Sequence, residues 1–361
     1  MRILPDTKLD FDDVLLVPKR SRHNSEVSSR DHVDTTRPLK MPHAGTTVEG
    51  CPIIAANMDS VGSLAMADAL TKHNMFTALH KFYSEDQLVN FFQDPIRSRN
   101  TFFTIGIRQE DMDKIASVKR RVAGTNKAFP KMICMDVANG YIQKFIDEVK
   151  KCREKFPKAI IMAGNIVTPD IVVELIQNAG ADILKIGLGS GSVCTTRLMT
   201  GVGYPQFSAI SECADAAHGA GGLICSDGGC KGYDDVCKAL AGGADMVMLG
   251  GMLSGTDECE GEWITEDIVI NDEVVSKKFL KFHGMSSEEA QVKHYGGVAS
   301  YKAAEGKEVN IPYKGSVESV IKKIKGGLRG TCSMVGADKL KDLSKCASFI
   351  RVNNTHNRVY E

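Results

Sequence analysis

Short apolar segments recur along most of the chain, and each of them ends in small or polar residues. Runs of four or five such residues are typical of strands buried in a parallel sheet. Between them lie longer stretches in which apolar residues recur with a period near 3.6, and this period predicts amphipathic helices. Eight segments are expected to be strands: 52–56, 75–79, 102–106, 132–135, 159–163, 183–186, 222–225 and 246–249.

The helical stretches alternate with these strands. The clearest is 141–155, in which Ile142, Phe145, Ile146 and Val149 fall on one face. Parallel strands need crossover connections, so this alternation predicts a parallel sheet. Eight units fit an α/β fold of the (β/α)8 TIM-barrel type, whereas a doubly wound open sheet stays open because the pattern does not show closure. Helices are expected at 63–73, 85–93, 110–122, 141–155, 170–179, 208–219 and 233–242.

Two regions interrupt this rhythm, a glycine-rich loop at 187–206 and a long polar insertion at 254–315. Long excursions from a compact domain are usually functional, so the insertion is expected to be a lid. We therefore predict a single barrel domain over 1–361, with an irregular N-terminal extension at 1–50, the loop, the lid, a last helix near 316–327 and a tail at 338–361.

The composition narrows the classes of partner. The 45 basic and 45 acidic residues balance, so no overall field favours nucleic acid or an anionic membrane. No apolar run resembles a signal peptide or a membrane span, and a cytoplasmic location is expected. The 11 cysteines form no Cys-x-x-Cys pair, which disfavours a zinc site or a disulfide framework and predicts reduced thiols.

The loop Gly187–Arg197 carries the first candidate chemistry. Its alternating glycines let backbone groups approach a ligand, and Cys194 lies beside Thr195, Thr196 and Arg197. Such a cysteine is a candidate nucleophile, although a buried structural thiol is the alternative. A dinucleotide-binding fingerprint would open a helix at once, but the continuation 198–205 is too rich in glycine and proline for one. We therefore predict a flexible loop.

Polar residues follow the expected strands, at the end where α/β barrels place their active sites. The glycine pairs after the seventh and eighth strands could bind a phosphate, and Asp227 could accept hydrogen bonds from ribose hydroxyls. These features predict a bound nucleoside monophosphate, with ordinary strand-to-helix turns as the alternative. The polar set comprises Asn57–Asp59, His80, Lys81, Asp136–Asn139, Gly164, Asn165, Ser226–Gly229 and Gly250–Met252.

Five segments together resemble the IMP dehydrogenase/GMP reductase family, over about residues 8–352: 52–58, 191–197, 200–206, 226–229 and 249–252. Within the family, three features resemble the reductases. There is no room for the regulatory domain that dehydrogenases usually insert after the second barrel unit. Tyr301–Lys307 resembles the reductase lid motif, and Phe349–Val352 resembles the reductase C-terminal segment.

The resemblance implies an oxidoreductase of purine nucleotide salvage that converts GMP to IMP and ammonia with NADPH. Cys194 would add to carbon 2 of the guanine and form a thioimidate. Thr196 and Glu305 match the pair that protonates the departing ammonia, for which lid closure could raise the pKa of Glu305 by desolvation. A solvated lid carboxylate is the alternative reading of Glu305.

The resemblance also implies three sets of binding residues and a homotetramer, in which 20–27 and 330–333 lie near a neighbour's cofactor. For the substrate they are Ser192, Asp227, Gly228, Gly229, Gly250, Gly251, Gly284, Met285, Ser286, Lys302, Ala303, Ala304, Glu305 and Gly306. For the cofactor they are Lys81, Asp136, Val137, Ala138, Leu188, Gly189, Met285, Tyr301, Lys302, Gly330, Thr331, Cys332 and Ser333. A monovalent cation, expected to be potassium, would lie at Gly189, Gly191, Cys194 and Arg197.

The sequence departs from the family pattern at several positions. Lys302 replaces a usual arginine and Ser190 a usual proline, and the stretch 264–280 lengthens the lid beside the single tryptophan, Trp263. His23 and Asn24 stand where Ser-Arg usually lies near the 2′-phosphate, which leaves the choice between NADPH and NADH open. Two other functions are weighed: an IMP dehydrogenase without a regulatory domain, and a nucleotide-sensing barrel that binds GMP without turnover.

Overall fold

The computed structural model describes residues 3–20, 30–270, 273–298, 300 and 303–353. Eight strands pair in parallel and close into a barrel, because the last strand returns to the first with Val247 opposite Ile53. The predicted (β/α)8 barrel is thereby confirmed and the open sheet is excluded. The strands are β4 (Ile53–Ala55), β5 (Phe76–Ala78), β6 (Thr101–Ile105), β7 (Met132–Asp136), β8 (Ile160–Ile166), β9 (Ile183–Ile186), β10 (Leu223–Asp227) and β11 (Met246–Leu249).

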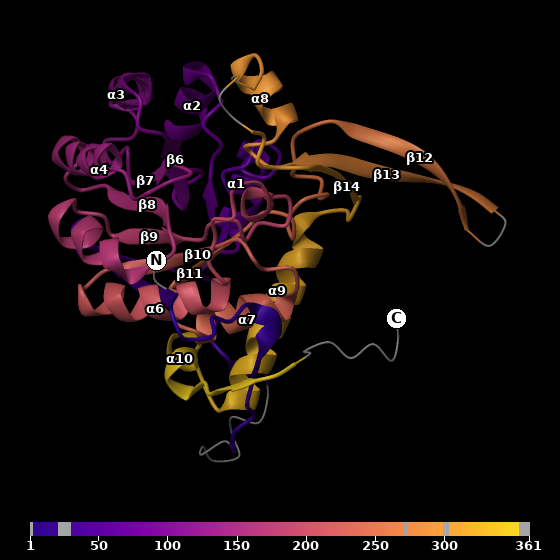
Figure 1. Cartoon of the computed structure of the whole chain (residues 1–361). Coiled ribbons are helices and arrows are strands. Elements are labelled where there is room, and N and C mark those ends of the chain that lie inside the picture. Colours follow the sequence, from indigo (N-terminus) through magenta and orange to yellow (C-terminus); the bar gives the residue numbers. More distant parts are fainter. Residues whose placement is uncertain (1–2, 21–29, 271–272, 299, 301–302, 354–361) are drawn as a thin grey trace.

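Helices surround the barrel, as Figure 1 shows. Local capping fixes where several of them begin: the hydroxyls of Ser63 and Ser84 accept the backbone N–H groups of Met66 and Gln87. The outer elements are α1 (Leu64–Lys72), α2 (Glu85–Phe92), α3 (Gln109–Val122), α4 (Gln143–Lys155), η4 (Pro169–Ile171), η5 (Glu174–Asn178), α6 (Gln206–Gly219), α7 (Tyr233–Ala241) and α9 (Val317–Val335).

Three helical predictions need correction. The expected helix 170–179 is a 3-10 turn followed by a π-helix, in which the N–H of Ala179 donates to the carbonyl of Glu174. The loop expected to be flexible contains a short helix, α5 (Thr196–Thr200), which Gly201 ends at a φ of 70°. The last helix continues to Val335, beyond the predicted end at 327, because its apolar face continues with the buried side chains of Leu328 and Cys332.

The amino end of the barrel is closed by a hairpin in the segment that was expected to be irregular. Strands β2 (Arg37–Met41) and β3 (Thr46–Gly50) pair antiparallel. Their buried residues Leu39, Met41 and Val48 pack with the side chains that fill the barrel. Buried and exposed residues alternate along both strands, as a half-buried strand requires. Each strand has only five residues, so this alternation is too short to stand out in the sequence. The filling side chains include Ile54, Phe76, Phe102, Met132, Met162 and Met246.

Two buried aspartates reinforce the same end, each directly before a strand and after an alanine. Asp182 accepts the Arg153 guanidinium at 2.6 Å and the backbone N–H of Ile161 at 2.9 Å. Asp245 accepts the imidazole of His218 at 2.8 Å and the backbone N–H of Ile224 at 2.9 Å. The repeated pattern ties each strand to its preceding neighbour in the barrel.

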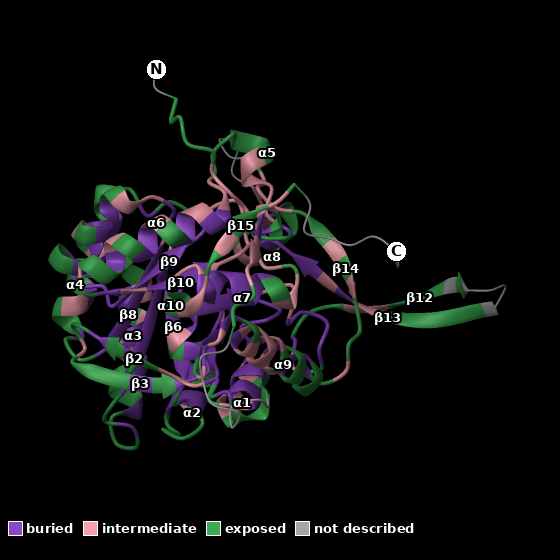
Figure 2. Ribbon diagram, turned by 90° about the horizontal axis from the view of Figure 1, so that it is seen from below, coloured by how far each residue is buried: buried purple, intermediate pink, exposed green. Residues whose placement is uncertain are grey.

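The 254–315 segment is not an irregular polar loop but contains a three-stranded antiparallel sheet and a helix. Its hairpin projects from the barrel, and Figure 2 shows that much of it is exposed. At the foot of the hairpin, the Trp263 ring packs edge-on against Tyr313, with the centroids 5.8 Å apart. The elements are β12 (Trp263–Ile270), β13 (Glu273–His283), α8 (Glu288–Tyr295) and β14 (Glu308–Pro312).

Within the described residues, the tail predicted at 338–361 contains a short helix and a strand and is joined to the N-terminal part of the chain. Strand β15 (Phe349–Arg351) pairs antiparallel with β1 (Val14–Leu16). The remaining short helices are η1 (Phe11–Asp13), η3 (Arg30–His32), η6 (Leu340–Asp342) and α10 (Leu343–Cys346). None of the helices in the described part of the chain is both long and apolar enough to cross a membrane.

Candidate active site

A cavity of about 300 Å³, hereafter the first cavity, opens at the carboxyl ends of the barrel strands. Its walls come from the carboxyl ends of six strands, from the loops after five of them and from two parts of the 254–315 segment. The structure thus brings together residues that are far apart in the sequence. The predicted site residues in these walls are Asp136, Val137, Ala138, Leu188, Gly189, Gly191, Ser192, Cys194, Thr196, Asp227, Gly228, Gly229, Gly250, Gly251, Gly284, Met285, Ser286 and Glu305.

The three predicted catalytic side chains form a continuous chain of hydrogen bonds. Cys194 Sγ lies 3.3 Å from Thr196 Oγ1, and Thr196 Oγ1 donates to Glu305 Oε2 at 2.6 Å. A threonine hydroxyl has one proton, and since it is given to Glu305, the oxygen is left to accept the thiol proton. The geometry therefore provides a path along which a proton can pass from the thiol to the carboxylate.

Backbone contacts hold Glu305 in this position. The N–H of Glu305 donates to the carbonyl of Ser286 at 2.9 Å, and Thr195 N donates to the carbonyl of Glu305 at 3.3 Å. An antiparallel bridge also joins Cys194 to Gly306. A Cβ at Gly306 would lie 3.0 Å from Ser287, so only glycine fits this close approach without a shift. The two segments that carry the thiol and the carboxylate are thus fixed to each other.

A buried lysine, Lys185, stands at the base of the first cavity. Its Nζ lies 2.6 Å from Asp136, 3.0 Å from Asp227 and 3.3 Å from the amide oxygen of Asn57. Burial alone would lower the pKa of Lys185, but the two carboxylates raise it well above its ordinary value. Lys185 in turn keeps the pKa of Asp136 low, against the effect of burial. Lys185 was not among the residues predicted from the sequence, although a lysine inside an apolar strand is a visible signal.

The turn after β10 suits a phosphate-bearing ligand. Gly228 and Gly229 have φ of 86° and 83°, in the left-handed region that favours glycine. A Cβ at Gly228 would lie 2.5 Å from Ser190 Oγ. Ser190, which stands where proline is usual, donates its hydroxyl to the carbonyl of Asp227 at 3.1 Å and so supports this turn. The Asp227 carboxylate also accepts Asn165 Nδ2 at 2.8 Å.

A second cavity, of about 880 Å³, adjoins the first. It contains the predicted Lys81 and also Arg108, His294 and Tyr295, which our sequence analysis did not identify. Lys81 Nζ lies 5.7 Å from the ring centroid of Tyr295, and the Arg108 guanidinium lies 5.8 Å from it. Two cations beside aromatic rings fit an anionic, ring-bearing ligand such as a dinucleotide. The wall common to both cavities is formed by Asn57, Asp136, Val137, Ala138, Met285 and Ser286.

The predicted cation set offers backbone oxygens. The carbonyl of Gly191 accepts the N–H of Cys194 at 3.0 Å, and the carbonyl of Arg197 accepts that of Gly201 at 3.1 Å. Each carbonyl keeps a second lone pair, so the set fits a hard monovalent cation. The side chain of Arg197 is engaged with Asp10 at 3.2 Å and with the carbonyl of Tyr204. Within the described ranges, no three His, Cys, Asp or Glu side chains cluster as metal ligands.

Some predicted residues do not line either cavity. Gly330–Ser333 lie in α9, where Cys332 is buried, and Ala303 and Ala304 are outside both walls. Tyr301, Lys302, His23 and Asn24 lie outside the described residues. The roles of these residues stay predictions.

Cys194 differs from most of the other thiols. It is half-buried in a cavity wall, whereas burial raises the pKa of the thiols of Cys51, Cys134, Cys152, Cys213 and Cys332 to about 12. A thiol must ionise to act as a nucleophile, so these buried cysteines are poor candidates. Cys194 has the exposure and the neighbours that such a role needs.

Comparison with known proteins places the chain among nucleotide enzymes. A family model described as IMP dehydrogenase / GMP reductase domain matches residues 8–358. The chain is 51% identical to the GMP reductase of Photobacterium profundum over 362 residues, covering 100% of this chain and 99% of that protein. It is also 51% identical over 360 residues to GMP reductase 1 of Homo sapiens, covering 99% of each. The GMP reductase of Serratia proteamaculans is 50% identical over 362 residues, covering 100% of this chain and 99% of that protein.

Proposed function

The chain belongs to the IMP dehydrogenase / GMP reductase family, and on this premise we propose that it reduces GMP to IMP and ammonia with NADPH in purine nucleotide salvage. The observation that carries the proposal is the chain of contacts from Cys194 through Thr196 to Glu305. It lies at the wall of a cavity that adjoins a second one. A nucleophile and a proton donor are both within reach of one bound base.

In the first half-reaction, Cys194 Sγ bonds to carbon 2 of the guanine. The thiol proton passes through Thr196 to Glu305, because the hydrogen bonds run in that direction. Glu305 then gives the proton to the exocyclic amino group, the bond from carbon 2 to nitrogen breaks, and ammonia leaves. The product is a thioimidate, in which the sulfur of Cys194 has replaced the amino group at carbon 2. Covalent catalysis divides one difficult displacement into two easier steps.

The surrounding residues bind and orient the nucleotide. Asp227, held by Lys185 and Asn165, would accept hydrogen bonds from the ribose hydroxyls. The glycine turns after β10 and β11 would face the phosphate. The second cavity would hold NADPH, with Lys81 and Asp136–Ala138 near its nicotinamide end. The bound dinucleotide supplies the hydride that reduces carbon 2, after which the cysteine is released.

Three further features belong to the proposal. The 254–315 segment acts as a lid because it carries Glu305 and Ser286 to the first cavity. A potassium ion on the carbonyls of the 189–197 loop would fix that loop beside Cys194. A cytoplasmic homotetramer is proposed from the family alone, and light scattering of the purified protein measures its mass.

The deciding experiment compares two reactions under identical conditions: GMP with NADPH, and IMP with NAD. We expect GMP-dependent oxidation of NADPH with release of ammonia, and no formation of XMP. Robust XMP formation without GMP reduction would establish the dehydrogenase instead. A parallel assay with NADH measures cofactor selectivity directly.

A further inference from the structure

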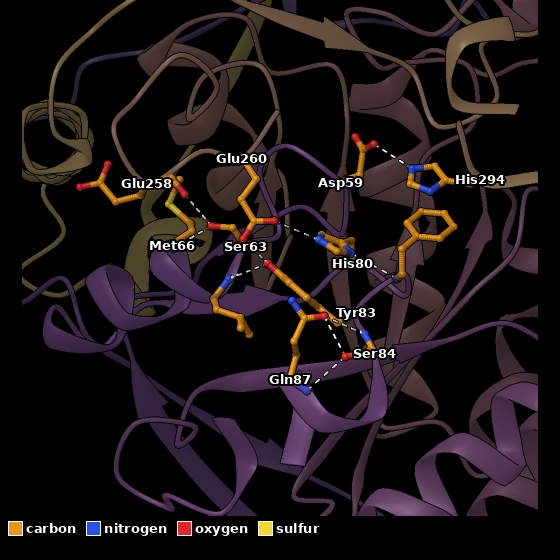
Figure 3. A network of polar contacts seen from close by, with 12 residues as sticks. Asp59, Ser63, Met66, His80, Tyr83, Ser84, Gln87, Glu258, Glu260 and His294 are labelled. Atoms are coloured by element: carbon orange, nitrogen blue, oxygen red, sulfur yellow. Dashed lines mark hydrogen bonds and ion pairs between the residues drawn. The ribbon is translucent and has the colours of Figure 1, made fainter. Parts of the chain in front are cut away.

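The lid is attached to the barrel at two points, both drawn in Figure 3. The first is at its beginning, where Glu260 accepts the hydroxyl of Tyr83 at 2.5 Å and lies 3.6 Å from His80 Nε2. Ser63 Oγ also donates to the carbonyl of Glu258 at 2.5 Å. These contacts secure the segment that leads into the hairpin.

The second attachment is centred on one carboxylate, Asp59, in the loop after β4. It accepts Lys293 Nζ at 2.7 Å, His294 Nε2 at 2.8 Å and His283 Nε2 at 3.3 Å. All three donors come from the lid, and the side chain of Asp59 is only 4% exposed. The backbone N–H of Asp59 also points to Met285 Sδ at 3.4 Å. One barrel residue thus contacts the lid on both sides of the turn that follows β13.

The charge state of this cluster follows from its contacts. Burial alone would raise the pKa of Asp59, but the hydrogen bonds from His283, Lys293 and His294 hold it well below its usual range. The hydrogen bond to Asp59 raises the pKa of His283, while burial lowers that of His294. Glu260, Glu308 and His80 are the other charged or titratable groups that act on these histidines or their partners. Asp59 is therefore ionised at neutral pH.

The residues that Asp59 holds bracket the wall between the two cavities. Met285 and Ser286, which line both cavities, lie between His283 and Lys293 in the chain. His294 itself lines the second cavity, where its ring stacks on Phe82 with the centroids 3.5 Å apart. A shift of this segment would move the wall of the nucleotide cavity and that of the dinucleotide cavity together.

We propose that Asp59 is a positioning residue, which fixes segment 283–294 and thereby aligns the dinucleotide with the base bound beside Cys194. This proposal rests on the proposed function. Net stabilisation is a weaker explanation, because a buried ionic cluster often stabilises a protein no more than apolar side chains of similar volume would. Alignment has a larger effect, since a misplacement of about 1 Å can cost about 100-fold in rate.

The test compares Asp59→Asn with Asp245→Asn. Both changes remove the charge of a buried carboxylate that binds an imidazole and a cationic side chain, but Asp245 lies at the opposite end of the barrel. For Asp59→Asn we expect faster hydrogen exchange over 285–295 and a KM for NADPH raised about 10-fold. We also expect kcat lowered about 10-fold or more. The KM for GMP should rise by a smaller factor than that for NADPH, because only residues 284–286 of this segment line the first cavity. Asp245→Asn should lower the free energy of unfolding and leave kcat and both KM values near those of the wild type.

Lys293→Met provides a second variant that keeps Asp59 and both histidines. It should also speed hydrogen exchange over 285–295 and raise the KM for NADPH, each by a smaller factor than Asp59→Asn does. If Asp59→Asn does not fold, this variant tests the positioning role instead. Wild-type exchange over 285–295, or equal kinetic changes in the Asp245 variant, would overturn the proposal. If the wild type itself fails to reduce GMP, the proposed function is wrong, whereas the exchange data still decide whether Asp59 holds the lid.

Discussion

The two ends of the barrel both bury carboxylates beside cations, yet they use them differently. At the amino end, both oxygens of Asp182 are occupied, by the N–H groups of His43 and Ile161 and by Arg153. At the carboxyl end, the first cavity leaves Asn165 Oδ1 buried with no partner among the described residues. The carboxylate oxygens of Asp182 are thus fully used within the protein, whereas the amide oxygen of Asn165 in the cavity wall is free to bind a ligand. Substitutions at the two ends should therefore fail in different ways.

The largest expected effect is that of Cys194→Ala. Removal of the proposed nucleophile should lower GMP turnover at least about 1,000-fold, because the proposed thioimidate forms on this thiol. The free energy of unfolding and the affinity for GMP should stay near the wild-type values. Steady-state kinetics, urea unfolding and calorimetry measure these three quantities. Unchanged turnover would contradict the covalent mechanism, and loss of turnover with retained GMP binding would also exclude a sensing barrel that works without chemistry.

Asp182→Ala tests the opposite end. The substitution removes the carboxylate that pairs with Arg153 and accepts the N–H groups of His43, Ala44 and Ile161. We therefore expect a loss of about 3–5 kcal/mol in the free energy of unfolding. The kcat of the folded fraction should be that of the wild type. Urea unfolding measures the free energy of unfolding. Active-site titration followed by steady-state kinetics gives the kcat of the folded fraction. A large fall in kcat with little loss of stability would show that the amino end of the barrel also contributes to catalysis.

Glu305→Gln should act on one half-reaction more than on the other. The amide keeps the contact with Thr196 but cannot give a proton to the departing amino group, so the deaminating step should slow about 100-fold. Reduction of NADP by IMP, which needs no ammonia, should slow less. Single-turnover experiments in each direction separate the two steps. Equal losses in both would assign Glu305 a purely structural part.

The smallest effect concerns pH at the amino end. The hydrogen bond to Asp245 raises the pKa of His218, so the stabilisation is complete below about pH 6.5 and is lost as the pH rises through the raised value. The His218 side chain is 43% exposed and therefore screened, which keeps the expected change below about 1 kcal/mol. Urea unfolding of the wild type and of Asp245→Asn should give stabilities that converge with rising pH. A constant difference would mean that His218 contributes nothing.

Much of the barrel was predictable because each strand and helix has its own period in the sequence. Gly228, Cys194 and Asp227 could be placed at one end, since the carboxyl ends of parallel strands meet there. Lys185 was missed because it stands within an apolar strand, and only the structure shows that Asp136 and Asp227 surround it. A charged residue in such a run is a signal that could have been used.

The lid shows where local patterns are insufficient. Asp59 and His294 are brought together by tertiary packing, and nothing near either residue indicates the other. The segment 254–315 was predicted only as a polar insertion, and its strands β12, β13 and β14 were missed, because they are mostly exposed and carry little of the hydrophobic alternation of a buried face. The short helix α5 forms although glycine and proline follow it closely, because Gly201 ends it after a single turn. Such features depend on contacts that a sequence window does not contain.

The position of Trp263 has a practical consequence. The single tryptophan of the chain lies at the foot of the hairpin, between Tyr313 and Lys278, whose Nζ is 4.3 Å from its ring centroid. Selective excitation of indole therefore reports on the lid and not on the barrel. Quenching by the nearby ammonium would change if the hairpin bent at this point, so emission intensity is an intrinsic optical probe of hairpin motion that needs no added label.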